Sequence, residues 1–371
     1  MSDEPAWAAA ASSEPQVPYE VDLADAEAVL DLSRLGLDAP TVDGNLEALD
    51  GDGRAARLRL VDLRHNVLER LPGRIGAFSG LHTLDVSHNR LDCLSEHMPP
   101  GLRVLLATGN RLRCLPKALA TLSGLRVLNV SGNRLDALPP PLLELRDLRA
   151  LYAGGNRIEQ VSRDIGKLEK LEVLYLGGNR LRELPAELGS LGQLQSLVLS
   201  QNRLVTLPSS LCGLRRLRSL ALHDNLLTTL PPCVVRLQNL VELSLRGNPL
   251  VVRFVRDMTY EPPKLQELAA RCVKTQRVPF EKGELPAAVM AYLESAQRCV
   301  NPKCKGVYFD ARVEHIKFVD FCGKYRLPLL QYLCSTQCSS QLASGAASSE
   351  SEASDEESGV DMSRLRRVLL G

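Results

Sequence analysis

The chain has ten cysteines, and four of them form two close pairs in its last quarter. Twenty-nine residues lie between the two pairs. Thiolates are strong zinc ligands, and two such pairs fit a closed tetrahedral site that is structural rather than catalytic. The predicted zinc ligands are Cys299, Cys304, Cys334 and Cys338. Cys322 and His315 are reserve ligands, and the alternative is four ordinary reduced thiols.

Short strands must hold these pairs together. Residues 307–309 and 316–319 have the apolar and aromatic composition of strands, and residues 329–333 lead into the second pair. A module this small has too little core, so zinc would add the missing stability. Because the acidic N-terminus carries only a short apolar run, residues 6–11, we expect no secretory signal and a reducing compartment. The predicted location is the cytoplasm, with the nucleus as the alternative.

An amphipathic helix is predicted before the cysteine module. Apolar side chains recur at helical spacing after two prolines, which suit a helix entry. They are Leu265, Leu268, Ala269, Cys272 and Val273. The dipeptide Leu285-Pro286 then opens a second apolar segment. Such helices either cap the open end of a repeat array or present an apolar face to a partner.

An asparagine series organises the middle of the chain. Its members are Asn66, Asn89, Asn110, Asn133, Asn156, Asn179, Asn202, Asn225 and Asn248, with steps of 23, 21 and then 23 residues. Each ends the pattern L-x-x-L-x-L-x-x-N, in which Val or Ala fills some of the apolar slots, and most units continue to Leu-Pro. The period with Leu-Pro resembles the short intracellular class of leucine-rich repeats. The fold class predicted is an α/β solenoid of nine clear repeats with a parallel concave sheet. Each Asn side chain is expected to bond backbone groups of neighbouring coils.

The outward strand positions form a candidate surface for a protein substrate. Tyr152 and Tyr175 stand on adjacent repeats beside glycines, and aromatic side chains on such a face suit a binding hot spot. The expected substrate-binding residues are Tyr152, Tyr175, Leu106, Val198 and Asn129. The alternative is that the two rings only stack across the repeats for stability.

Composition excludes several classes of function. The 45 basic and 44 acidic residues leave a formal charge of +1, which gives no electrostatic case for nucleic acid or for an acidic membrane. No apolar run is long enough for a membrane span. No P-loop, dinucleotide fingerprint or nucleophile elbow is present, so we expect no enzyme.

Changes in composition divide the chain into six predicted segments. Residues 1–20 and the acidic, serine-rich residues 339–371 are expected to be disordered. Between them we expect a cap or degenerate repeat at 21–57, the repeat solenoid at 58–255, a helical region at 256–295 and the zinc module at 296–338.

The helical region resembles the suppressor-of-cytokine-signalling box, whose first helix, the elongin BC box, docks on elongin C. The family pattern is a small residue, Leu, three variable residues, a small residue, three more and an aliphatic residue. The resemblance implies the elongin C-binding residues Leu265, Leu268, Ala269 and Val273, with Leu265 filling a deep pocket. Lys264 departs from the pattern, because the family has a small or polar residue there.

In this family a cullin-selecting Leu-Pro motif follows, and Leu285-Pro286 is similar to it. The resemblance implies that Leu285 and Pro286 contact a cullin. Ala288 stands where the cullin-5 motif usually has a second proline, so cullin-5 and cullin-2 both stay open. A rival reading takes residues 330–334 as the elongin helix, but Cys334 would then lie in a partner's groove rather than on zinc.

A broader resemblance to one family of leucine-rich repeat proteins is carried by residues 248–338, including NPLVVRFVRD, CVNPKC and YLCSTQC, and by the final VLLG. It implies a non-catalytic substrate-recognition subunit of an elongin B/C–cullin-RING ubiquitin ligase, in the ubiquitin conjugation pathway. The alternative is an intracellular signalling scaffold with no link to a ligase.

Overall fold

The computed structural model describes residues 28–51, 57–232, 234, 237–250, 263–279, 284–302, 304–321, 325–338 and 367–369. The chain divides into two compact units, Met1–Arg157 with Lys167–Val173 and Ile158–Gly166 with Leu174–Gly371. The N-terminal segment 1–20, most of the tail 339–371 and the reserve ligand Cys322 lie outside the described residues.

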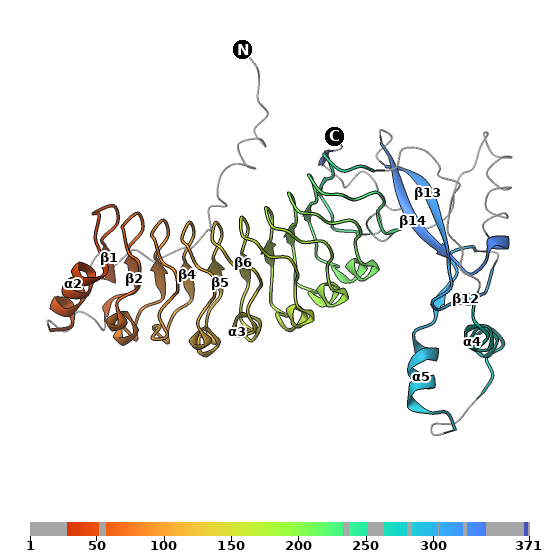
Figure 1. Cartoon of the computed structure of the whole chain (residues 1–371), viewed down its shortest axis with the longest axis horizontal. Helices are drawn as coiled ribbons and strands as arrows, with labels where there is room; N and C mark the ends of the chain where they lie inside the picture. Colours follow the sequence, from red (N-terminus) through yellow and green to blue (C-terminus); the bar gives the residue numbers. More distant parts are fainter. Residues whose placement is uncertain are drawn as a thin grey trace, which may run out of the picture. The chain divides into compact units, whose positions relative to one another are not determined.

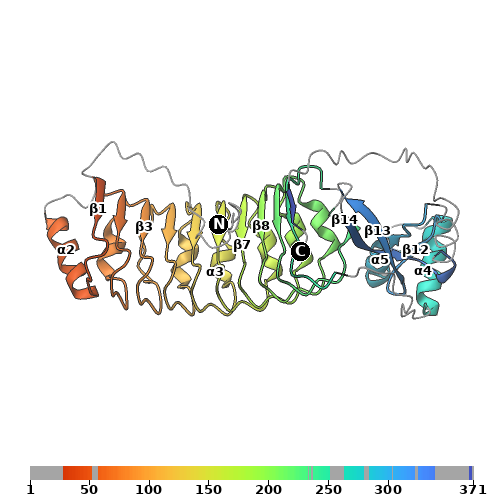
Figure 2. The same cartoon turned by 90° about the horizontal axis from the view of Figure 1, so that it is seen from above.

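Ten short strands form a parallel sheet in chain order (Figures 1 and 2). From the second strand on, the middle residue is a buried Leu or Val, as in Leu105 and Leu128, which pair in register. Because alternate side chains point to opposite faces, each repeat adds one apolar side chain to a continuous core. The strands are β1 (Val29–Asp31), β2 (Leu60–Asp62), β3 (Thr83–Asp85), β4 (Val104–Leu106), β5 (Val127–Asn129), β6 (Ala150–Tyr152), β7 (Val173–Tyr175), β8 (Ser196–Val198), β9 (Ser219–Ala221) and β10 (Glu242–Ser244).

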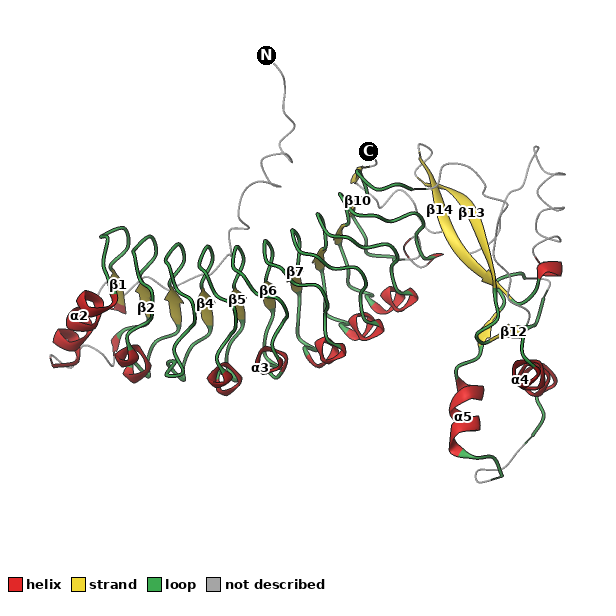
Figure 3. Cartoon of the chain, in the orientation of Figure 1, coloured by secondary structure: helices red, strands yellow, loops and turns green. Residues whose placement is uncertain are grey.

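A short helix returns the chain in most coils, and Figure 3 shows these helices in a second row beside the strands. The Leu-Pro pattern explains where they start, because the proline stands in extended backbone immediately before the helix, as Pro116 and Pro185 do. Each helix buries an aliphatic residue against the core, such as Leu119 or Leu188. The helices are η3 (Gly73–Ala77), η4 (Lys117–Thr121), α3 (Pro140–Leu143), η5 (Arg163–Lys167), η6 (Ala186–Ser190) and η7 (Ser209–Gly213).

The asparagine ladder is confirmed. Asn133 is 7% exposed, and its Nδ2 donates to the carbonyls of Ala107 and Val130, both at 2.9 Å. Its Oδ1 accepts the N–H of Leu112 at 3.0 Å. One buried amide therefore satisfies backbone groups of its own coil and of the coil before it. The same pattern recurs at the other ladder positions, for example at Asn202.

The coil that is two residues short keeps this ladder. Asn110 still donates to the carbonyl of Val86 at 3.0 Å and accepts the N–H of Leu91 at 3.1 Å. All residues between β3 and β4 are described, and this coil contains no helix. The missing length is therefore absorbed on the helical side of the coil, while the strand and the asparagine turn are unchanged.

Two further elements lie at the ends of the sheet. At the start, β1 pairs with β2 and helix α2 (Ala39–Gly51) follows. At the other end, β15 (Arg367–Leu369) pairs in parallel with β10, with Leu243 opposite Val368. The structure differs here from the expectation of a wholly disordered tail, because the free edge of β10 offers backbone groups that an extended segment can pair with.

The C-terminal region contains two helices and two antiparallel strand pairs. The helices are α4 (Leu265–Gln276) and α5 (Ala287–Glu294), and the strands are β11 (Gln297–Arg298), β12 (Val307–Tyr308), β13 (Val313–Phe321) and β14 (Tyr325–Leu333). Ala270, Leu293 and Phe309 form a small core between α4, α5 and the end of β12. The N–H of Leu230 donates to Pro328 and its carbonyl accepts from Leu330, both at 2.9 Å, so β14 is bonded to a late repeat.

Candidate metal centre and docking helix

The structure brings the four predicted zinc ligands together. The sulfur atoms of Cys299, Cys304, Cys334 and Cys338 all lie within 4.8 Å of one another. Cys334 Sγ is 3.5 Å from the sulfur of Cys304 and 3.7 Å from that of Cys338. Four thiolates around a tetrahedral zinc, with bonds of about 2.3 Å, are separated by about 3.8 Å. The cluster therefore has dimensions that fit zinc, and the prediction that the two cysteine pairs meet is confirmed.

Backbone geometry supports this cluster. Cys304 N–H donates to the carbonyl of Asn301 at 3.0 Å, which closes the turn between the first two cysteines. The N–H groups of Gly306 and Cys334 donate to sulfur atoms at 3.3 and 3.4 Å. A Cβ on Gly306 would lie 3.0 Å from Cys304 Sγ and 3.1 Å from Cys334 Sγ, so glycine keeps the space beside the sulfurs open. The N–H hydrogen bonds to sulfur and the role of Gly306 were not predicted.

Burial raises the pKa of the Cys334 thiol, and its hydrogen bonds to the sulfurs of Cys304 and Cys338 raise it further. A raised pKa means that the thiolate is disfavoured unless a cation neutralises it. Among the described residues, the candidate metal site consists of the four cysteines alone, and His315 is not a member.

Helix α4 presents one apolar face to solvent. Leu265 is 83% exposed and Leu268 is 49% exposed. Ala269 and Cys272 are exposed too, so the helical positions i, i+3, i+4 and i+7 form a continuous surface stripe. We call these four residues the α4 docking face. Val273 lies instead against the small core of Ala270, Leu293 and Phe309.

A buried ion pair fixes the opposite face of α4. Glu267 is 3% exposed, and its Oε1 accepts hydrogen bonds from Arg271 Nε at 3.0 Å and from the N–H of Phe309 at 3.1 Å. Its Oε2 accepts the N–H of Ala311 at 2.8 Å. Arg271 also donates to the carbonyl of Cys334 at 2.7 Å and to that of Ala311. Sequence reasoning missed this pair, although Glu and Arg four residues apart on an apolar helix were a signal.

The two predicted cullin-binding residues have different surroundings. Leu285 is half-buried and packs against the small core of the helical region. Pro286 is exposed and stands in extended backbone before α5. Ala288 and Val289, in the first turns of α5, are exposed as well.

The predicted substrate residues lie on the strands of the repeats. Leu106 and Asn129 are buried, and Tyr152 is only 6% exposed. Tyr175 and Val198 are half-buried. Burial raises the pKa of both tyrosines, so their hydroxyls stay protonated at neutral pH. The exposed part of this set is smaller than the sequence suggested.

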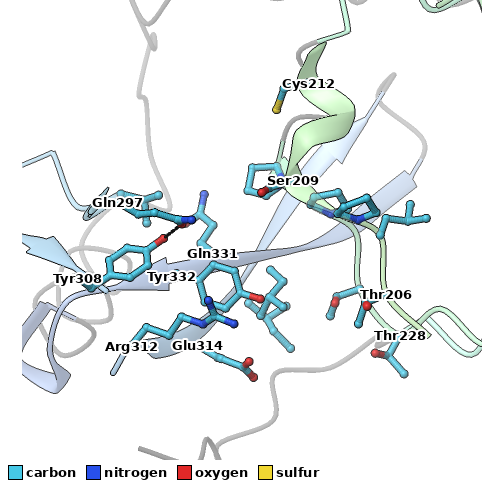
Figure 4. Close-up of a pocket in the computed structure, with 18 residues that line it drawn as sticks. Thr206, Ser209, Cys212, Thr228, Gln297, Tyr308, Arg312, Glu314, Gln331 and Tyr332 are labelled. Carbon is cyan, nitrogen blue, oxygen red and sulfur yellow. Dashed lines mark hydrogen bonds between the residues drawn. The ribbon is translucent and has the colours of Figure 1, made fainter. Parts of the chain in front are cut away.

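A pocket that sequence reasoning did not find lies within the second unit, between loops of the late repeats and the C-terminal strands (Figure 4). Its volume is about 860 Å³. The Arg312 guanidinium lies 4.2 Å from the centroid of the Tyr332 ring, and the Tyr308 hydroxyl donates to Gln297 Oε1 at 2.9 Å. Burial raises the pKa of Tyr308 to about 12. The pocket combines these polar groups with an apolar wall that includes Leu207, Pro231 and Ile316.

Comparison with known families identifies the repeats. The family described as "Leucine-rich repeat region" matches residues 156–282, and "Leucine Rich Repeat" matches residues 124–145. The repeats are leucine-rich repeats. None of the helices in the described part has the length and apolar character needed to cross a membrane.

Curated relatives carry the name leucine-rich repeat-containing protein 58. The chain is 59% identical to the Xenopus tropicalis protein over 125 residues, which are 34% of this chain and 35% of that protein. It is 58% identical to the Homo sapiens protein over 126 residues, which are 33% of this chain and 34% of that one. The chain thus spans about a third of the length of the curated relatives it matches. The family resemblance noted in the sequence is confirmed.

Among solved structures, the leucine-rich repeat ectodomain of the plant receptor kinase GASSHO1/SCHENGEN3 from Arabidopsis thaliana is similar. The TM-score is 0.51 and the identity 29%, over 60% of this chain and 27% of that one. That ectodomain was solved in complex with CASPARIAN STRIP INTEGRITY FACTOR 2.

Proposed function

We propose that this leucine-rich repeat protein is a non-catalytic substrate-recognition subunit of an elongin B/C–cullin-RING ubiquitin ligase. The observation that carries the proposal is the α4 docking face. A side chain as apolar as Leu265 is 83% exposed beside a second exposed leucine, on a helix held by its other face. An exposed apolar helix stripe of this kind fits a hydrophobic groove on a partner.

The docking face fits elongin C by its chemistry. Leu265 would enter the deep pocket, Leu268 would extend the apolar contact, and Ala269 would let the helix approach closely. Val273, which the family resemblance also implies, packs inside this chain and would act by positioning α4. Pro286 and the exposed start of α5 are the proposed cullin contact, with cullin-5 or cullin-2 as the cullin.

The four cysteines are proposed to hold a structural zinc. The sulfur separations support this assignment, because they match those of four thiolates around one zinc ion. A four-thiolate zinc leaves no position for a substrate, so its role would be to stabilise the module.

A protein substrate is proposed to bind the strand surface of the repeats. Tyr175 and Val198 offer partly exposed apolar area, and Tyr152, Leu106 and Asn129 are the more buried members of the proposed set. The pocket that includes Arg312 and Tyr332 would add contacts from the C-terminal region. The ligase complex would do the chemistry, while this chain brings substrate and ligase together.

Co-purification with elongins B and C tests the central claim. Wild-type full-length chain should retain both elongins, and Leu265→Asp with Ala269→Asp should lose them, because two carboxylates would be buried in an apolar groove. Gln266→Asp is the matched control, since it adds a charge at an exposed α4 position outside the docking face. Absence of elongins from the wild-type complex would favour a signalling scaffold whose helical region is only a cap.

A further inference from the structure

We propose that Glu267 and Arg271 are positioning residues that make presentation of the α4 docking face depend on metal binding by the four cysteines. The inference rests on the proposed zinc site, and it adds a means of regulating the proposed docking site. It joins two features that are separate in the sequence, because the ion pair touches both the docking helix and the cysteine cluster.

The link to the cluster is made by Arg271. Its Nη1 donates to the carbonyl oxygen of Cys334 at 2.7 Å, and Cys334 is one of the four clustered cysteines. Its Nη2 donates to the carbonyl of Ala311, in the loop between β12 and β13. A guanidinium presents its donors in a fixed fork, so both acceptors must be in place at once.

The link to the helix is made by Glu267. Four hydrogen bonds converge on its carboxylate, from Arg271 Nε at 3.0 Å, Arg271 Nη2 at 2.5 Å, Phe309 N–H and Ala311 N–H. Burial alone would raise the pKa of Glu267, but the hydrogen bonds from Ala311, Arg271 and Phe309 outweigh it, and the pKa is lowered. Glu267 is therefore a carboxylate at neutral pH, and it needs these partners to stay buried.

The apolar packing of α4 in the described part of the chain rests on Ala270 and the half-buried Val273. The buried residues of the helix are Glu267 and Ala270 alone. Ala270 is a small side chain, and the core that it shares with Leu293 and Phe309 is correspondingly small. The hydrogen bonds of Glu267 and Arg271 add to this small apolar packing, and one of them ends on the Cys334 carbonyl. The direction of α4 therefore depends in part on the turn at Cys334 that follows β14.

Metal binding keeps that turn formed. The four sulfur atoms lie within 4.8 Å of one another, but four neutral thiols attract one another only weakly. A divalent cation bound to four thiolates instead fixes the backbone around them. When the turn opens, Arg271 loses the Cys334 carbonyl, the buried Glu267 pair is weakened and α4 is released. Loss of the metal would then remove the docking face without touching any of its four residues.

Hydrogen exchange of residues 265–276 in the full-length chain tests this coupling without any partner. With one equivalent of zinc bound, removal by a chelator should speed exchange in α4 by about tenfold or more, as loss of charge-assisted hydrogen bonds implies. Arg271→Ala should exchange quickly with and without zinc. Lys274→Ala, which changes another α4 cation outside these bonds, should behave as wild type.

Linkage supplies a second measurement. If zinc protects α4 through Arg271, then Arg271→Ala must lower zinc affinity by the factor by which zinc stabilises α4. Competition with a chromogenic chelator measures that affinity. If the alanine variant does not fold, Arg271→Lys and Glu267→Gln can be used to test the coupling instead. In both, the effect of zinc on α4 exchange should lie between those of wild type and Arg271→Ala. Cys299→Ser should reduce zinc content directly.

The outcomes separate the two ideas. Zinc at one equivalent with α4 exchange that is unchanged on its removal would overturn the coupling and leave the metal site standing. A wild-type chain that binds no zinc would overturn both the coupling and the metal site. Coupled exchange without any elongin binding would support this inference while removing the proposed ligase role.

Discussion

Single side chains already decide the repeat architecture, and the ladder asparagines show how. Asn133 bonds three carbonyls and one N–H group, all buried or partly buried. Asn133→Ala should lower the free energy of unfolding by about 1–3 kcal/mol, because these backbone groups would stay buried without partners. Chemical denaturation with far-ultraviolet circular dichroism measures the loss.

Asn45→Ala is the control for this prediction. Asn45 lies exposed on α2, and its removal should change stability by less than about 0.5 kcal/mol. Equal losses for the two variants would mean that the ladder bonds add nothing beyond the general effect of substitution.

Residue spacing predicted the asparagine ladder because its signal repeats within a short stretch of sequence. It predicted the cysteine cluster because closely spaced cysteines are a specific signal. The steps between asparagines repeat within one coil, and cysteines at short spacing have few other uses in a reducing compartment. Contacts of Glu267 were not predictable in this way. Its backbone partners Phe309 and Ala311 lie 42 and 44 residues away, and the Arg271 bond to Cys334 spans 63 residues. No periodic pattern encodes such pairs.

At the scale of elements, the strand β15 was not predicted because it follows an acidic, serine-rich stretch around residues 348–358, and the whole tail was assigned to disorder. Its pairing with β10 makes a specific expectation. Val368→Pro with Leu369→Pro should abolish the pairing, since proline has no N–H to donate and resists a ladder position. The backbone amide of Leu243, opposite Val368, should then exchange about tenfold faster, whereas the amide of Glu242 donates to Arg218 on the other side and should change less.

Ala353→Pro with Ser354→Pro is the matched control, because it introduces the same residues outside the strand. A synthetic peptide of residues 361–371 should restore protection of β10 in the Val368→Pro, Leu369→Pro chain. Unchanged exchange in that variant would show that β15 does not protect the edge of β10.

At the scale of the whole molecule, mutation can separate substrate binding by the repeat surface from elongin binding by the helical region. Under the proposed function, Tyr175→Ala should weaken capture of a protein substrate by about tenfold or more, as loss of an aromatic anchor does. Retention of elongins B and C should be unaffected. Quantitative mass spectrometry of proteins bound to the purified full-length chain measures both effects.

Tyr152→Ala should differ from Tyr175→Ala in one respect. Because Tyr152 is 6% exposed, its truncation should also lower the melting temperature. Tyr175 is half-buried, so its truncation should lower the melting temperature less. If neither variant changes the bound proteins, the tyrosines serve the stacking of the repeats and the substrate surface lies elsewhere.

The short coil between β3 and β4 tells a protein engineer where this array tolerates a change of length. This coil is two residues shorter than the others, yet the hydrogen bonds of Asn110 and the strand register are kept. Residues 95–97, which are exposed or half-buried between the buried Leu94 and Met98, are therefore a suitable insertion point for a reporter peptide or a fluorophore site. An insertion of two residues next to a ladder asparagine would instead shift the register of the following strands.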